Sequence, residues 1–308
     1  MEIAPASGGA TRGAGAATDA VAPALLPGHA RPAACLNCDT PLTGKFCADC
    51  GQPAATHRLT MGHLLHEIPH AVWHVDKGIV FTLHALLLRP GATVLGYLGG
   101  QRARYFAPVS LLLLVTGVAS FVAVKTGMSE QASTLNGDAS AALRAAQAQG
   151  LESTFLYMSW IYVAVSPLIA WVVRRALRRA RLNLAEALVA VCYLTAASNL
   201  LTLVLTPFYY GIHSATFYFW VSTGSSLLLL AYQGWAYGQL LLHTSLGRWG
   251  RWWRGLLTAV AAYGLVMLGG LVLAFALNWG SFKAAGEKEL KARRAQQPHA
   301  APAAPPRP

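Results

Sequence analysis

The sequence predicts an all-α polytopic membrane protein, with about five transmembrane helices and a small N-terminal zinc ribbon. Two observations carry this prediction. Of the 308 residues, 55% are hydrophobic and only 12% are charged, and the apolar residues gather in runs long enough to cross a bilayer. Ahead of these runs, four cysteines form two Cys-x-x-Cys pairs. A metal knuckle joined to a hydrophobic body is therefore expected.

The cysteine pairs are Cys35-Leu-Asn-Cys38 and Cys47-Ala-Asp-Cys50. Each turn brings two thiolates together, and two facing turns supply the four soft ligands of a closed, structural Zn²⁺ site. Two disulfides are the alternative, and they would require an oxidising compartment. Because residues 1–5 contain neither a basic region nor an apolar run, we expect no signal peptide and prefer a reduced, metal-binding cluster. Cys192, in a long apolar stretch, is expected to be a small buried hydrophobe.

Composition divides the chain into five parts. The first residues are rich in Ala, Gly and Pro, and the last are rich in Ala, Pro and charge, so neither end is expected to bury a core. We predict a disordered leader over 1–34, the ribbon over 35–53, a cytoplasmic histidine-rich juxtamembrane segment over 54–105, a membrane domain over 106–279 and a disordered tail over 280–308. Within the juxtamembrane segment, residues 79–88 are apolar but too short to cross, which predicts an interfacial helix.

The predicted crossings lie near residues 107–126, 154–173, 185–206, 216–241 and 256–277. The crossings at 185–206 and 216–241 come from one long apolar stretch, which is divided by Pro207, Gly211 and neighbouring aromatic residues. Polar Asn199 is expected to hydrogen-bond between helices, and Gly234-Trp-Ala-Tyr-Gly238 has the small-xxx-small spacing of a helix contact.

Arginines set the expected orientation. Arg102 and Arg104 precede the first crossing, five arginines lie within 174–181, and three lie within 248–254, whereas the alternate loops carry few basic residues. The positive-inside rule then places the N-terminus and the arginine loops in the cytoplasm of a bacterial inner (cytoplasmic) membrane. Five crossings would leave a basic C-terminal tail outside, so four or six crossings stay open.

Short motifs follow one another from the cysteines to the first crossing. They are the two cysteine pairs, the second within Phe46-Cys47-x-x-Cys50-Gly51-Gln52, then His57-Arg58, Leu64-Leu65-His66-Glu67, His74-Val75-Asp76-Lys77-Gly78, Arg89-Pro90-Gly91 and Arg104-Tyr105-Phe106-Ala107-Pro108. This succession, over about residues 35–115, resembles an uncharacterised bacterial membrane family, domain of unknown function 3667. The resemblance implies a zinc ribbon fused to a multi-helix membrane domain, and it implies no established activity.

The histidine-rich segment allows three hypotheses. His66-Glu67-x-x-His70 matches the motif in which two histidines bind zinc and the glutamate activates water, with Asp76 as a possible third ligand, although a proline inside the motif would distort the helix. Alternatively, His66, His70 and His74 form one helical stripe that holds zinc or iron with Glu67 and Asp76 nearby. The preferred hypothesis is an amphipathic stripe in the headgroup region, without metal.

The favoured function is that of a non-enzymatic integral membrane protein whose ribbon recruits a cytoplasmic protein partner or orders the juxtamembrane segment. A four-thiolate zinc site leaves no open coordination position for catalysis. The alternatives are a membrane-embedded metalloenzyme, with Glu67 as the catalytic residue, and a transporter, although the interiors of the predicted crossings lack Asp, Glu, Lys and Arg.

The net charge of +12 bears on partners. Because the arginines lie at membrane boundaries, we expect them to meet anionic lipids of the bilayer, and we expect no nucleic-acid partner. A homo-oligomer stays open.

Overall fold

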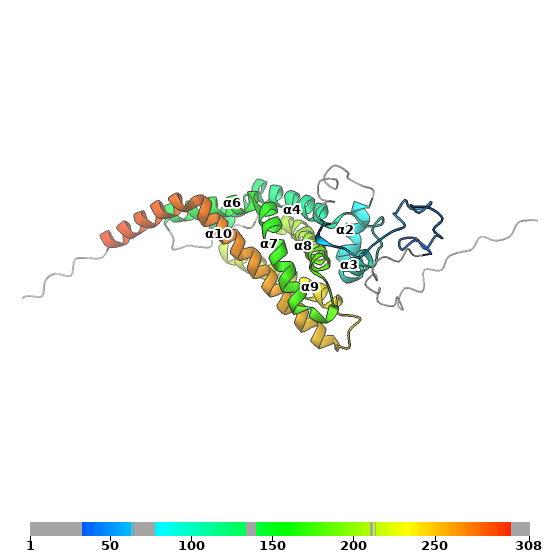
Figure 1. Cartoon of the computed structure of the whole chain (residues 1–308). Helices are drawn as coiled ribbons and strands as arrows, with labels where there is room; N and C mark the ends of the chain where they lie inside the picture. The colour runs from blue at the N-terminus through cyan, green and yellow to red at the C-terminus, as the bar shows by residue number, and fades with distance from the viewer. Residues whose placement is uncertain are drawn as a thin grey trace, which may run out of the picture.

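The computed structural model describes residues 33–62, 64, 78–133, 140–209, 212 and 214–296. These residues form helices and no named strand, with two isolated antiparallel bridges, Ala34 to Pro41 and Phe46 to Pro53. The predicted all-α class is therefore confirmed for the described part of the chain. Figure 1 shows the helices in an elongated bundle, with the blue cysteine-bearing segment at one end beside two short helices.

The elements follow the chain in this order: α2 (Ile79–Leu88), α3 (Pro90–Leu98), α4 (Pro108–Lys125), α5 (Met128–Ser133), α6 (Ala141–Leu156), α7 (Met158–Ala176), the 3-10 turn η1 (Arg178–Ala180), α8 (Leu184–Leu205), the 3-10 turn η2 (Thr206–Tyr209), α9 (Ala215–Gln239) and α10 (Arg248–Gln296).

Helix α8 is the centre of the bundle. It packs against α2, α3, α4, α7 and α9. All but one of the residues from Ala185 to Ser198 are buried, and many are alanines, so neighbouring helices can approach closely on every side. Cys192 is 2% exposed within this stretch, which confirms that it is a buried hydrophobe.

Three stretches are long and apolar enough to cross a membrane: α4, α8 with η2, and α10 up to Lys291. Helices α6 and α7 are bent by 68° at Tyr157 and make a fourth if the pair is one span. Helix α9 has 25 residues but is not among them, because Ser, Thr, Gly and Gln lower its hydropathy. The described residues thus contain three or four candidate spans, and the count of five stays a prediction.

Helix α10 extends well past the predicted crossing at 256–277. It has 49 residues, is kinked at Asn278 and continues to Gln296, whereas the sequence predicted disorder from residue 280. Its last residues are mostly Ala, Lys, Glu and Arg, which favour helix. Helix α6 packs along this part of α10 (Figure 1), and Asn278 Nδ2 donates to Ser153 Oγ at 3.1 Å. Tertiary contact therefore supports a local helical preference.

Two predicted helix contacts are confirmed. A Cβ added to Gly255 of α10 would lie 2.0 Å from the carbonyl oxygen of Gly234 and 2.6 Å from the amide nitrogen of Gly238, so α9 and α10 touch backbone to backbone. Asn199 of α8 donates to Thr116 Oγ1 of α4 at 2.9 Å, and its amide oxygen accepts from the Tyr162 hydroxyl of α7 at 3.4 Å. The amide side chain of Asn199 therefore links three helices.

The outside of the bundle is apolar. Large hydrophobic side chains are exposed along α4, α7, α9 and α10, among them Phe121, Trp160, Trp220 and Val272. An exterior with many exposed apolar side chains is costly in water and is normal where lipid covers it. Together with the candidate spans, it gives a helical protein built to lie in a membrane.

Candidate metal centre

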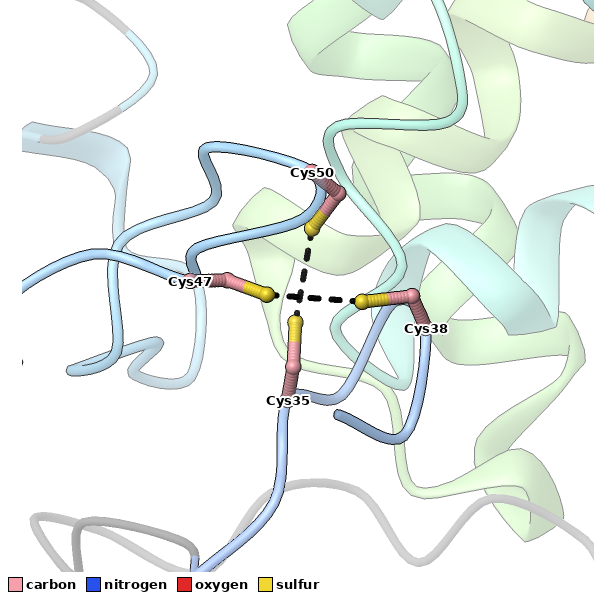
Figure 2. A group of neighbouring side chains, drawn as sticks. All are labelled: Cys35, Cys38, Cys47 and Cys50. Carbon is pink, nitrogen blue, oxygen red and sulfur yellow. Dashed lines mark hydrogen bonds between the residues drawn. The ribbon is translucent and has the colours of Figure 1, made fainter. Parts of the chain in front are cut away.

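The four predicted cysteine ligands meet at one point. Their sulfurs all lie within 4.8 Å of one another, and the two diagonal pairs, Cys35 with Cys50 and Cys38 with Cys47, are 3.5 and 3.4 Å apart. Figure 2 shows the four side chains pointing from opposite sides toward a common centre. These distances exceed an S–S bond of about 2.05 Å, so all four cysteines are free thiols.

The loop that holds these thiols is a repeated unit of twelve residues. In the first knuckle, Cys35 N–H donates to Thr40 O and Asp39 N–H donates back to Cys35 O; in the second, Cys47 N–H donates to Gln52 O and Gly51 N–H to Cys47 O. A third bond closes each unit, from Leu42 N–H to Ala33 O and from Ala54 N–H to Lys45 O. Each bond of the first knuckle thus recurs twelve positions later.

The backbone of the two knuckles also repeats. Asp39 and Gly51 occupy equivalent positions and have φ of 61° and 73°, in the left-handed region. Glycine and aspartate accept this conformation more readily than most residues. The signal for the repeat was present in the sequence, because Cys47 and Cys50 follow Cys35 and Cys38 at the same interval.

The donor set fits a tetrahedral metal ion. Zinc–thiolate bonds of about 2.3 Å separate the sulfurs of a tetrahedral site by about 3.8 Å, close to the diagonal distances seen here. Cys35 and Cys47 are each 3% exposed, so the metal would lie in a partly dehydrated position. No other group of three or more candidate ligands occurs in the part of the chain that the structure describes.

Neighbouring groups shift the pKa values of two of these thiols in opposite directions. Contacts of the Cys38 sulfur with the side chain and then the backbone of Thr40 lower the pKa of Cys38 to about 6, whereas burial raises the pKa of Cys50 to about 12. The thiol of Cys38 therefore loses its proton more readily than the thiol of Cys50. The two knuckles are also joined directly, because the Thr40 hydroxyl donates to Asp49 Oδ2 at 2.5 Å.

The ribbon docks on the turn that follows α3. Leu36, between the first two cysteines, packs on Gly100, where an added Cβ would lie 2.7 Å from Leu36 Cδ1. Gly100 has a φ of 106°, which disfavours any other residue. The first knuckle therefore rests on a turn that only glycine forms without strain.

Gln52, two residues after the last cysteine, ties the second knuckle to the same turn. Its Nε2 donates to Gly100 O at 2.8 Å, and its Oε1 accepts from the backbone N–H groups of Arg102 and Ala103, both at 3.0 Å. Gln52 is 3% exposed, so these bonds satisfy a buried amide side chain. Its burial makes the Gly100 turn and the ribbon one unit.

The segment after the ribbon is fastened to α8. Arg58 forms a bidentate ion pair with Glu186, with Nε to Oε1 at 2.7 Å and the second nitrogen to Oε2 at 2.8 Å. This hydrogen bonding raises the pKa of Arg58. Asn183 Nδ2 donates to Leu59 O at 3.0 Å, and the Arg102 guanidinium donates to His57 O. The segment after the ribbon is therefore held on the first turn of α8, and we call residues 54–62 the linker.

The remaining motif residues hold α2 and α3 in place. Gly91 N–H donates to Gln239 Oε1 of α9 at 2.8 Å, and a Cβ on Gly91 would lie 2.2 Å from Gln239 Cβ. Thr82 Oγ1 accepts from Phe106 N–H at 2.9 Å, and the Tyr193 hydroxyl of α8 donates to Phe106 O at 2.6 Å. The short helices are thus part of the packed body.

One of the comparisons with known proteins matches this part of the chain. The family model described as Protein of unknown function (DUF3667) matches residues 76–119. The predicted resemblance is confirmed there. No curated protein and no solved structure matches the chain.

The DUF3667 match runs from just before α2 into α4. It contains Gly91, Gly100 and Phe106, whose contacts place the ribbon on one side and the long helices on the other. The described residues of the DUF3667 stretch that precede α4 are therefore a platform between the cysteine cluster and the bundle. We call residues 78–106 the platform below.

The second predicted site cannot be placed. His66, Glu67, His70, His74 and Asp76 lie outside the described residues. Of the other histidines in the segment, His57 lends its backbone carbonyl to Arg102, and His84 lies on α2. The hypotheses of a histidine metal site and of Glu67 as a catalytic residue therefore stay predictions.

Proposed function

We propose that this protein is a non-enzymatic membrane protein in which a structural Zn²⁺, held by Cys35, Cys38, Cys47 and Cys50, holds the ribbon on the platform and its linker on the helical bundle. The observation that carries the proposal is the burial of Gln52, which follows the second knuckle and makes three hydrogen bonds to the Gly100 turn. Of the two roles expected for a ribbon, ordering of the juxtamembrane segment is the one that these contacts favour.

The metal supplies what the ribbon lacks. The described residues of the ribbon bury few apolar side chains of their own. So small a unit rarely folds without a metal or a disulfide. Metal binding by four thiolates contributes folding free energy directly, because the site does not exist in the unfolded segment. Zn²⁺ at this site would therefore determine whether Leu36 and Gln52 reach the Gly100 turn.

The docked end also supports the proposed location. Arg58 contacts Arg181 O at 3.1 Å. Gly91 of the platform donates to Gln239, and the adjacent Gly238 lies against the backbone of Arg251. Two of the arginine loops therefore lie at the end of the bundle that carries the ribbon. Under the positive-inside rule this end faces the cytoplasm of a bacterial inner membrane. Thiols stay reduced there, as a four-cysteine zinc site requires.

Limited proteolysis of the full-length protein tests the proposal. The double variant Cys47→Ser with Cys50→Ser should lose its zinc and be cleaved faster between residues 54 and 62, because the ribbon no longer holds this linker on α8. The matched control is Cys192→Ser, which removes a thiol that lies far from the cluster in the chain. Loss of zinc with unchanged cleavage would show that the metal does not order the linker.

One exposed side chain favours the second candidate role, recruitment of a cytoplasmic partner. Phe46 precedes Cys47 and is 62% exposed, although phenylalanine is costly to leave in water. Replacing Phe46 with Ser should leave zinc binding and protease resistance unchanged under the ordering role. If the unmodified protein can be cross-linked to another protein and the Phe46→Ser variant cannot, recruitment would be supported in addition.

A further inference from the structure

A cleft opens where α9 ends and α10 begins. Its volume is about 660 Å³. Its lining consists of four residues from the last turns of α9 and the loop after it, and four from the first turns of α10: Trp235, Gly238, Gln239, Leu242, Arg248, Trp249, Arg251 and Trp252. The cysteine cluster and the platform contribute none of these residues.

The cleft follows from the glycine contact between the two helices. An added Cβ on Gly238 would lie 3.1 Å from the carbonyl oxygen of Arg251, so the backbones nearly touch there. Larger side chains on either side of this contact, Trp235 and Leu242 from α9 and Trp252 from α10, then stand as walls. The approach of the two helices at Gly238 is between backbones, so it does not depend on flexible side chains.

The cleft has an unbalanced positive charge. Arg248 and Arg251 are its only charged lining residues, and neither contacts a carboxylate in the part of the chain that the structure describes. Each guanidinium presents a planar fork of N–H donors, which matches the oxygens of a phosphate group. Three residues apart on one helix, the two side chains can reach the same anion.

The walls indicate where this anion comes from. Three of the eight lining residues are tryptophans, and Trp249 is 82% exposed with its ring nearly perpendicular to that of Trp252, at a centroid distance of 6.1 Å. Tryptophan gathers at the headgroup level of bilayers, where one edge of its ring is wet and the other is apolar. The cleft also lies at the start of the candidate span of α10.

We propose that this cleft binds the headgroup of an anionic phospholipid, with the phosphate between Arg248 and Arg251 and the tryptophans at the level of the glycerol. The arginine loop at the start of α10 has the features of a binding site, because a cleft, two guanidinium groups without a carboxylate partner among the described residues and several tryptophans occur together there.

Native mass spectrometry of the full-length protein tests the assignment. The protein is purified in detergent and supplied with an equal mixture of phosphatidylglycerol and phosphatidylcholine, and the bound lipid is counted. We expect phosphatidylglycerol to be retained, and its affinity to fall on the order of tenfold in the variant Arg248→Gln with Arg251→Gln.

The matched control is Arg178→Gln with Arg179→Gln, which removes the same charge from exposed positions outside the cleft. It should keep the affinity of the unmodified protein, and Arg248→Lys with Arg251→Lys, which keeps both charges, should retain part of it. If the control and cleft variants lose affinity for phosphatidylglycerol equally, the lipid is held by diffuse electrostatic attraction and not by this cleft. Retention of both lipids alike would also overturn the assignment.

Inorganic phosphate distinguishes a lipid site from a site for a free anion. The proposal predicts that millimolar phosphate leaves bound phosphatidylglycerol in place, because the lipid is also held through its apolar part. Displacement of the lipid by phosphate alone would assign the cleft to a soluble phosphate compound and contradict the proposal.

Discussion

Arg58 and Glu186, 128 residues apart in the sequence, form a two-pronged ion pair that joins the segment after the cysteine knuckles to the first turn of α8. Glu186 is 1% exposed and also accepts from Asn183 N–H at 2.7 Å, while Asn183 Oδ1 accepts from Glu186 N–H at 2.9 Å. The same carboxylate therefore closes a capping box and holds the linker.

Replacing Arg58 with Ala should destabilise the protein because it leaves a buried carboxylate without its cation. Loss of one partner of a fully buried pair costs about 3–5 kcal/mol, and the 39% exposure of the Arg58 side chain reduces the expected cost to about 1–3 kcal/mol. Thermal unfolding in detergent measures the change. The double variant Arg58→Ala with Glu186→Gln should recover part of the loss, and strictly additive losses would show that the pair is not coupled.

A second prediction concerns Gly91→Ala in the DUF3667 stretch. The new Cβ would lie 2.2 Å from Gln239 Cβ, an atom too close to the α9 backbone to move away, so α3 must shift from α9. We expect a loss of about 1–3 kcal/mol, as for overpacked cores. Gly117→Ala is the control within the same stretch, because nothing lies within 4 Å of its added Cβ and alanine favours a helix. Equal stability of the two variants would argue against the α3–α9 contact.

The α9–α10 contact gives a third prediction. Gly255→Ala places a Cβ 2.0 Å from the Gly234 carbonyl oxygen, so the helices must separate and the cleft beside them must widen. Stability should fall by about 1–3 kcal/mol, and lipid retention should fall with it. Gly264→Ala, on the same helix with open space around it, should change neither property. A neutral Gly255→Ala variant would mean that the two helices are not in backbone contact.

Metal content gives a fourth prediction. The account predicts one equivalent of zinc per chain in protein purified without a polyhistidine tag, and none after Cys47→Ser with Cys50→Ser. Mass spectrometry of the bound metal measures both. A second equivalent, or iron, that disappears in His66→Ala with His70→Ala would support the metalloenzyme alternative instead.

Local patterns in the sequence predicted much of this structure. The spacing of the cysteines identified all four members of the cluster, and apolar run length identified α4 and α8 as candidate spans. The small-xxx-small spacing identified the α9 face that meets α10. In each case the information lies within one segment, because ligand spacing, helix length and helix face are local properties.

The rest depended on contacts between distant segments. No periodicity relates Arg58 to Glu186 or Gln52 to the Gly100 turn, so the docking of the ribbon was not predicted. The bend at Tyr157 and the extension of α10 past Asn278 occur where α6 packs against α10, and these two helices are distant in the sequence. The twelve-residue repeat of the knuckles was present in the sequence but becomes evident only from its hydrogen bonds.

The most direct test of the central claim is hydrogen exchange at the backbone N–H groups of Arg102 and Ala103, which donate to the Gln52 side chain. Exchange is compared by mass spectrometry between the zinc-loaded protein and protein stripped of metal by a chelator. If the metal holds the ribbon on the platform, removing zinc should speed exchange at these two amides while the core of α8 stays protected. Unchanged protection at Arg102 and Ala103 after complete loss of zinc would contradict the account.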